Sequence, residues 1–144
     1  MPEKQPNLLF VCIENSNRSQ MAEGFARKLG RGRATVFSAG SRPSGQINPR
    51  AIQFMKEKGI DLTVQLSKGL DDLPEVHWSY IVTMGCGDAC PLLPADHRLD
   101  WELPDPKHLD DAGFRAVRDR IEGLVDDLIA EATGPTDAQG QRQG

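Results

Sequence analysis

Three residues near the start of the chain are of types that could bind an anion and attack it. Cys12 is followed by Arg18 and Ser19, which gives the pattern Cys-x5-Arg-Ser. The planar fork of an arginine can hold two oxygens of a tetrahedral anion, and a serine hydroxyl can donate a hydrogen bond to a thiolate. The pattern therefore predicts Cys12 as a nucleophile, Arg18 as an oxyanion clamp and Ser19 as support for the thiolate.

Two neighbouring elements would position these side chains. Residues 8–11 form a short, wholly apolar run, which is typical of a strand buried on both faces of a parallel sheet. Apolar residues then recur at helical spacing from Met21 to Leu29, so a helix would begin near Arg18 or Ser19. The turn between them would point backbone N–H groups and the positive helix end at an anion above Cys12. We call this turn the oxyanion loop; it comprises Ile13, Glu14, Asn15, Ser16, Asn17 and Arg18.

Each of these residues also has a simpler interpretation. A cysteine at the end of a strand is most often a small buried hydrophobic residue, and an arginine at a helix start is usually a surface charge. The conjunction of a strand, Cys-x5-Arg-Ser and a helix is more specific, because it is the arrangement of cysteine-dependent phosphatases. We therefore favour the functional interpretation of Cys12 and Arg18.

Strand and helix patterns alternate along the rest of the chain. Residues 34–40, 80–84 and 97–101 are candidate strands, and helices are expected from Asn48-Pro49 to Gly59 and from Asp110 onward. This alternation predicts an α/β fold with a doubly wound, four-stranded parallel sheet flanked by helices. We expect a single domain over residues 1–133 and a flexible tail over residues 134–144, which are rich in Gly, Gln, Thr and Pro.

Composition and charge narrow the function classes. The chain has 144 residues, 38% of them hydrophobic and 26% charged, which suits one soluble domain. A net charge of −4 gives no general attraction to nucleic acid or to an anionic membrane. No stretch has the pattern of a membrane span or a signal peptide. We expect a cytoplasmic monomer without nucleic-acid or membrane partners.

Several motifs, in the same order along the chain, resemble a known family. Residues 12–23 resemble the low-molecular-weight protein tyrosine phosphatase superfamily, and the part Asn-Ser-x-Arg-Ser-Gln-Met-Ala-Glu resembles its arsenate reductase branch. Residues 37–40 (Phe-Ser-Ala-Gly), 81–84 (Ile-Val-Thr-Met) and 103–106 (Leu-Pro-Asp-Pro) match the same branch. The resemblance implies the low-molecular-weight phosphatase fold, an arsenate or phosphate-like oxyanion as ligand, and reduction of arsenate to arsenite for arsenic detoxification.

Two further cysteines, Cys86 and Cys90, lie in a glycine-rich stretch. They could be half of a metal site, two buried thiols or a redox relay; zinc is disfavoured because no matching histidine cluster accompanies them. The resemblance implies that Cys12, Cys86 and Cys90 form a thiol relay. It also implies no bound metal or cofactor and an external thiol reductant, either thioredoxin or glutathione or mycothiol with a glutaredoxin-type partner.

The resemblance assigns roles to more residues. Asp105, between two prolines, occupies the family's general-acid position, although an Asp-Pro pair alone would indicate only a turn. Asn15, Glu23 and Ser38 match residues that hold a potassium ion behind the loop in some arsenate reductases. Lys68 stands where an aspartate completes that site, so its ammonium could replace the cation and order the loop without potassium; the alternative is a solvated lysine.

Two departures from the family pattern lie within the oxyanion loop. Glu14 replaces a small residue, and its carboxylate would oppose anion binding unless it points outward. Asn17 stands where several relatives have a cysteine. Two other functions remain open at this stage: a tyrosine phosphatase that hydrolyses phosphomonoesters through a cysteinyl-phosphate, and a non-catalytic sensor that binds an anion without turnover.

Overall fold

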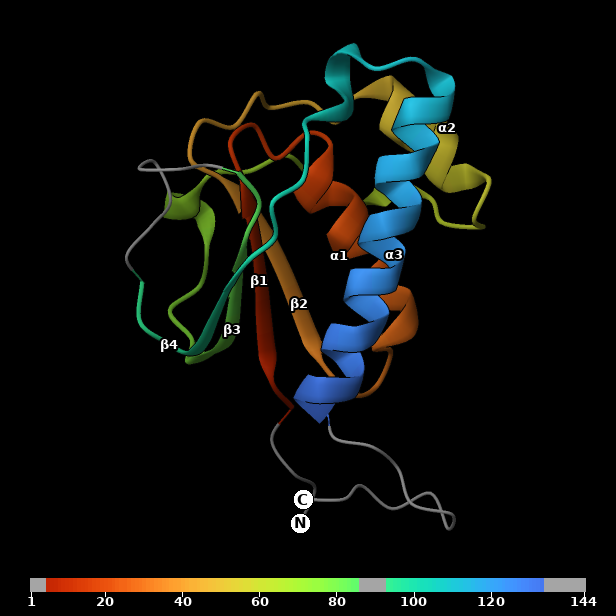
Figure 1. The fold of residues 1–144 in the computed structure, drawn as a ribbon. Coiled ribbons are helices and arrows are strands. Elements are labelled where there is room, and N and C mark those ends of the chain that lie inside the picture. The colour runs from red at the N-terminus through yellow and green to blue at the C-terminus, as the bar shows by residue number, and fades with distance from the viewer. Residues whose placement is uncertain (1–4, 86–92, 134–144) are drawn as a thin grey trace, which may run out of the picture.

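The structure, a computed structural model, describes residues 5–85 and 93–133. Its four strands, β1 (Asn7–Cys12), β2 (Thr35–Gly40), β3 (Trp78–Thr83) and β4 (Ala95–Asp100), form one parallel sheet in the order β2-β1-β3-β4. The α-helices are α1 (Arg18–Leu29), α2 (Pro49–Lys56) and α3 (Asp111–Thr133), and short 3-10 turns occupy η1 (Leu62–Val64), η2 (Leu70–Asp72) and η4 (Pro106–His108). The predicted α/β fold with a four-stranded parallel sheet flanked by helices is confirmed (Figure 1).

The residues of β1 alternate between two hydrophobic cores, because successive side chains of a strand point to opposite faces. Leu8 and Phe10 pack with side chains from all three α-helices, whereas Leu9 and Val11 pack with the segment around η2. Figure 1 shows α1, α2 and α3 together on one side of the sheet. In the described residues, the opposite face is covered by η2 and the turns next to it rather than by a long helix.

Two strands begin earlier than the sequence pattern indicates. β3 starts at Trp78 because the indole is buried and meets Phe37 of β2 edge to face, with ring centroids 5.2 Å apart. β4 starts at Ala95 and is an edge strand whose side chains are mostly exposed, so it carries little apolar pattern. The prediction that the first helix begins near Arg18 or Ser19 is confirmed, since α1 begins at Arg18.

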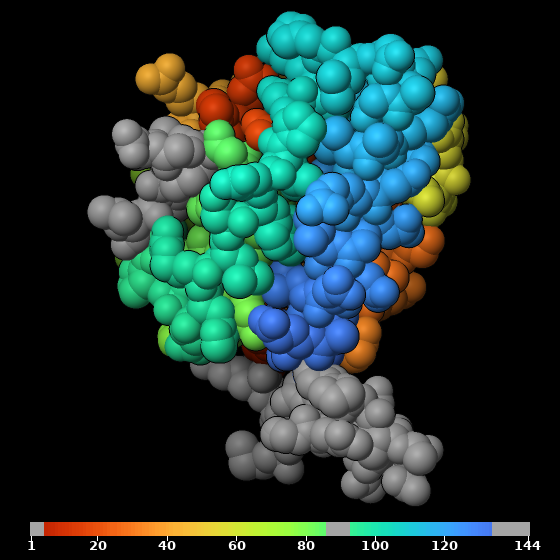
Figure 2. Space-filling view, in the orientation of Figure 1, coloured from red at the N-terminus to blue at the C-terminus, as the bar shows by residue number. Residues whose placement is uncertain are grey.

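The strand order places a ligand site at the end of β1. The chain passes from β1 to its neighbour β2 on one side and later returns to β3 on the other, and open α/β sheets bind ligands at the carboxyl end of such a switch point. The turn after β1, the loop after β2 and η4 gather at this end of the molecule (Figure 1). Figure 2 shows the turn after β1, in red, reaching the surface between the green end of β3 and the teal segment before α3. No helix in the described part of the chain is long and apolar enough to cross a membrane.

Candidate active site

The oxyanion loop (residues 13–18) is held in place through its backbone carbonyls. Backbone N–H groups from outside the loop donate hydrogen bonds to its carbonyls and to that of Cys12. Ser41 N donates to Cys12 O, Arg42 N to Ile13 O and Asn48 N to Ser16 O, at 2.8–3.2 Å. The N–H groups of residues 13–17 donate to none of the described residues. A loop held by its carbonyls, with its N–H groups free, is suited to bind an anion.

One residue of the loop has an unusual backbone conformation. Asn15 lies in the left-handed region with φ of +51°, which asparagine tolerates better than most side chains. Its side chain stabilises the turn, because Oδ1 accepts from Gln20 Nε2 and from Lys68 N, both at 2.8 Å. Gly40 lets β2 pass close behind, since a Cβ there would lie 2.9 Å from Asn15 N.

The Cys12 thiol lies at the carboxyl end of β1 and is 2% exposed. Its sulfur is 2.8 Å from Ser19 Oγ, on the first turn of α1. The structure therefore brings the predicted nucleophile and its predicted support into contact. A thiolate at this position would face the positive end of α1 and accept a hydrogen bond from the hydroxyl.

Arg18 is 6% exposed, and its guanidinium is oriented by contacts with Leu103 and Asp105. Its Nη1 donates to Leu103 O at 3.1 Å, and its Nη2 lies 3.9 Å from Asp105 Oδ2. Gly85 has a φ of +79°, and a Cβ there would lie 2.7 Å from Arg18 Nη1, so the glycine leaves room for the guanidinium. A small pocket is lined by Cys12, Glu14, Ser16, Asn17, Arg18 and Asp105.

Asp105 is held at the mouth of this pocket. Its Oδ1 accepts from Lys107 N at 3.0 Å, as the cap of η4, and from Asn17 Nδ2 at 3.4 Å. Its side chain is 43% exposed, so it can exchange protons with water. Asp105 lines the same pocket as Cys12; its predicted role as the general acid stays a prediction.

The predicted support residues form one buried network behind the loop. Ser38 Oγ accepts from Asn15 Nδ2 at 3.0 Å and donates to the carboxylate of Glu23, which is 1% exposed. Lys68 Nζ lies 3.4 Å from Glu23 Oε1 and 3.4 Å from Ser38 Oγ. Arg27 adds a second ion pair to Glu23, at 2.7 Å. Two cations therefore face one buried carboxylate, where the sequence had predicted a single ammonium.

Sequence reasoning missed two glutamines in this network. Gln20 is fully buried and donates to Asn15 Oδ1 and to Leu66 O, both at 2.8 Å. Gln65 in turn donates to Gln20 Oε1 at 2.7 Å. The available signal was a polar residue at Gln20, beside the apolar positions of the α1 helix.

Two of the predicted site residues cannot be compared with this geometry. Cys86 and Cys90 lie outside the described residues. Residues 5–85 and 93–133 contain no group of three histidine, cysteine, aspartate or glutamate side chains that could hold a metal ion.

Comparisons with known proteins find relatives of this chain in a single family. The family model for low molecular weight phosphotyrosine protein phosphatase matches residues 7–136. The glutaredoxin arsenate reductase of Synechocystis sp. is 38% identical over 127 residues, covering 86% of this chain and 96% of that protein. A solved structure of an arsenate reductase in the phosphate binding state matches with a TM-score of 0.80 at 37% identity, over 89% of this chain and 99% of that one. The thioredoxin-dependent arsenate reductase of Corynebacterium glutamicum matches with a TM-score of 0.74 at 30% identity, over 92% of this chain and 64% of that one. This chain therefore belongs to the low molecular weight phosphotyrosine protein phosphatase family, in the branch that includes arsenate reductases.

Proposed function

We propose that this protein reduces arsenate to arsenite with its own thiols. The observation that carries the proposal is the pocket that Cys12, Arg18 and Asp105 line together with the oxyanion loop, whose N–H groups at residues 13–17 donate to none of the described residues. Such a pocket suits a tetrahedral oxyanion, and three cysteines in the chain supply more thiols than ester hydrolysis needs. The arsenate reductase relatives support the choice of arsenate over a phosphoester.

In the first step, the Cys12 thiolate attacks the arsenic of arsenate. The S–As bond forms as an As–O bond breaks, and Asp105 supplies the proton to the departing hydroxide, which leaves as water. Arg18 and the loop N–H groups hold the remaining oxygens. The product is an arsenate ester of the Cys12 sulfur, with arsenic still in the +5 state.

In the second step, a thiolate of the Cys86/Cys90 pair attacks the Cys12 sulfur. The electron pair of the S–As bond moves to arsenic, arsenite leaves in the +3 state, and a disulfide remains. The third thiol then exchanges with this disulfide, leaving the pair oxidised and Cys12 free. An external dithiol of the thioredoxin type, in the cytoplasm, returns the pair to the reduced state.

The test is arsenite production from arsenate with NADPH, thioredoxin reductase and thioredoxin. A second arm replaces thioredoxin with glutathione and a glutaredoxin, because the relatives differ in the reductant that their names print, and a third supplies mycothiol with a glutaredoxin-type partner. We expect wild type to turn over in the thioredoxin arm, and Cys12→Ser, Cys86→Ser and Cys90→Ser each to lose turnover. Turnover only with a small thiol, with Cys86 and Cys90 dispensable, would contradict the relay.

A phosphatase is the second candidate function. The specific observation in its favour is that the pocket has the parts that phosphoester hydrolysis uses: a thiol, an oxyanion clamp and a carboxyl group. An aryl phosphate assayed in parallel separates the two. If the Cys86→Ser and Cys90→Ser variants still hydrolyse the aryl phosphate, and no reductant supports arsenate reduction by wild type, the protein is a phosphatase.

A further inference from the structure

The rim of the anion pocket carries a negative charge, which has the same sign as the expected ligand. Glu14 belongs to the oxyanion loop and lines the pocket together with Cys12 and Arg18. Its backbone is fixed at this place, because its carbonyl accepts from Ser44 N at 3.0 Å and from Ser67 Oγ at 3.2 Å. Glu14 therefore lies beside the site, where its carboxylate would repel an incoming dianion.

The structure compensates this charge with a lysine from the opposite rim. Lys107 Nζ lies 3.4 Å from Glu14 Oε1, and the two side chains are 47% and 39% exposed. In the described parts of the chain this is the ion pair that Glu14 makes. The pair thus crosses from the segment that carries Asp105 to the loop that holds the anion.

The backbone of Lys107, like that of Glu14, is held by two hydrogen bonds. Its N–H donates to Asp105 Oδ1 at 3.0 Å, and its carbonyl accepts from Arg50 Nη1 at 3.5 Å. Pro106, which precedes it, has its own φ fixed by the proline ring. The ammonium can therefore be removed by substitution while the backbone contact that orients Asp105 remains.

We propose that Lys107 is a positioning residue that neutralises Glu14 and thereby sets the affinity of the oxyanion loop for a tetrahedral dianion. The inference rests on the oxyanion site of the proposed function and concerns binding, before any redox step. Its first consequence is that the two charges act on the anion through each other. Removing Lys107 alone exposes the anion to an unpaired carboxylate, whereas removing both leaves the site close to its original potential.

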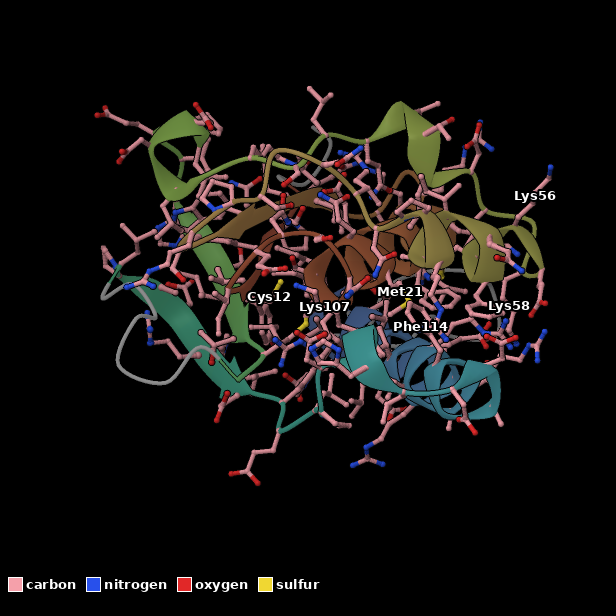
Figure 3. All side chains as sticks on the ribbon, turned by 90° about the horizontal axis from the view of Figure 1, so that it is seen from above. Cys12, Met21, Lys56, Lys58, Lys107 and Phe114 are labelled. Atoms are coloured by element: carbon pink, nitrogen blue, oxygen red, sulfur yellow. The ribbon has the colours of Figure 1, made fainter. Side chains whose placement is uncertain are left out.

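The test measures the dissociation constant of inorganic phosphate by calorimetry, with the full chain. The variants are Lys107→Gln, Glu14→Gln and the double variant. Lys56→Gln is the control, because it changes the net charge equally and Lys56 lies far from Cys12 and Lys107 (Figure 3). At low ionic strength we expect Lys107→Gln to weaken phosphate binding about fivefold to tenfold, the effect of one unit charge near a surface. Glu14→Gln should bind more tightly than wild type, and the double variant should bind within about twofold of wild type.

Two further readouts distinguish charge compensation from a structural role. The Lys107→Gln effect should shrink as the Debye length falls from about 30 Å at 0.01 M salt to about 10 Å at 0.1 M. In arsenate turnover the variant should raise KM and leave kcat nearly unchanged, because Asp105 keeps the hydrogen bond that it accepts from the backbone N–H of residue 107.

Three outcomes would overturn the inference. The first is a Lys107→Gln effect equal to that of Lys56→Gln, which would indicate net charge alone. The second is an undiminished effect in the Glu14→Gln background, which would mean that Lys107 contacts the anion directly. The third is a wild type that does not bind phosphate; arsenite production without phosphate binding would then remove this inference and leave the proposed activity standing.

Discussion

The Asn15 side chain fixes the direction in which the Ser19 hydroxyl points its proton. Asn15 Nδ2 donates to Ser19 Oγ at 2.8 Å, and an amide nitrogen cannot accept a hydrogen bond. The hydroxyl must therefore use its own hydrogen elsewhere, and the Cys12 sulfur lies 2.8 Å away. Ser19 thus donates to the sulfur, which favours the thiolate. Asn15, whose side chain stabilises the oxyanion loop, therefore also sets the direction of the hydrogen bond between Ser19 and Cys12.

Replacing Ser19 with alanine should slow the reactions of Cys12 at neutral pH. A hydrogen bond to a charged group is worth about 1.5–3 kcal/mol, so the rate of alkylation by iodoacetamide should fall by about tenfold or more. Ser41→Ala is the matched control, because the Ser41 hydroxyl is buried near the site and has no hydrogen-bond partner among the residues that the structure describes. If the two variants react at the same rate as wild type, Ser19 does not support the thiolate. The alkylated residue is identified by peptide mass, which separates Cys12 from Cys86 and Cys90.

Asp105→Asn should lower kcat and preserve anion binding. The amide oxygen can still accept from Lys107 N, so the cap of η4 survives while the proton donor is lost. General acid catalysis is typically worth about 10²–10⁴-fold, and kcat for arsenate should fall within that range. Asp110→Asn serves as the control, since Asp110 caps the start of α3 through Gly113 N at 2.8 Å and does not line the pocket. Equal kcat in wild type and Asp105→Asn would remove Asp105 from the mechanism.

Lys68→Met should destabilise the protein and make it sensitive to potassium. Glu23 is 1% exposed, and the substitution leaves its Oε1 with Ser38 as its partner while Arg27 stays on Oε2. Loss of one partner of a buried pair typically costs about 3–5 kcal/mol, but Lys68 is 24% exposed and Arg27 remains, so about 1–2 kcal/mol of unfolding free energy is expected.

The measurement is urea unfolding in potassium chloride and in choline chloride at equal ionic strength. Potassium should restore part of the stability of Lys68→Met, because the cation can occupy the place of the ammonium, and should leave wild type unchanged. Lys28→Met is the control, since Lys28 is exposed and donates to the carbonyl of Lys58 rather than to the network. Wild-type stability or turnover that depends on potassium would contradict the assignment of Lys68.

The part of the site that could be predicted from the sequence is the part whose chemistry is local. Cys12, Arg18 and Ser19 lie on one strand-turn-helix unit, so spacing alone brings them together. Asp105 could be singled out only from the family pattern. It lies near the other three residues because β4 and the segment after it return the chain to the same end of the sheet. Sequence reasoning could not find the ion pair between Glu14 and Lys107, because two exposed charges far apart in the chain carry no signal of their contact.

The start of β4 was predicted wrongly for a similar reason. β4 is an edge strand with exposed side chains, so its boundaries depend on pairing with β3 rather than on an apolar pattern. The network behind the loop was predicted only in part, because Gln20 and Gln65 act through backbone carbonyls that no motif specifies.

The contact between α2 and α3 should make the protein lose stability in acid. Glu57, just after α2, accepts from Arg115 at 2.9 and 3.0 Å and from Arg118 Nη1 at 2.5 Å. These hydrogen bonds, first to Arg115 and then to Arg118, lower the pKa of Glu57 from its usual 4.5 to about 2. A pKa that is lower in the folded state stabilises the fold above the unfolded value, and that stabilisation is lost as the pH falls through the folded value. The window of loss therefore runs from pH 4.5 down to about 2.

Glu57→Gln tests this link by difference. We expect the unfolding free energy of wild type to exceed that of the variant by a constant amount above pH 4.5, and the gap to close as the pH approaches 2. Other carboxyl groups titrate in the same range and cancel in the difference, which is measured by urea unfolding at each pH. Glu75→Gln is the control, because Glu75 is exposed and makes no ion pair among the residues that the structure describes. A gap between wild type and Glu57→Gln that does not change with pH would mean that Arg115 and Arg118 stabilise α2 and α3 without depending on the charge of Glu57.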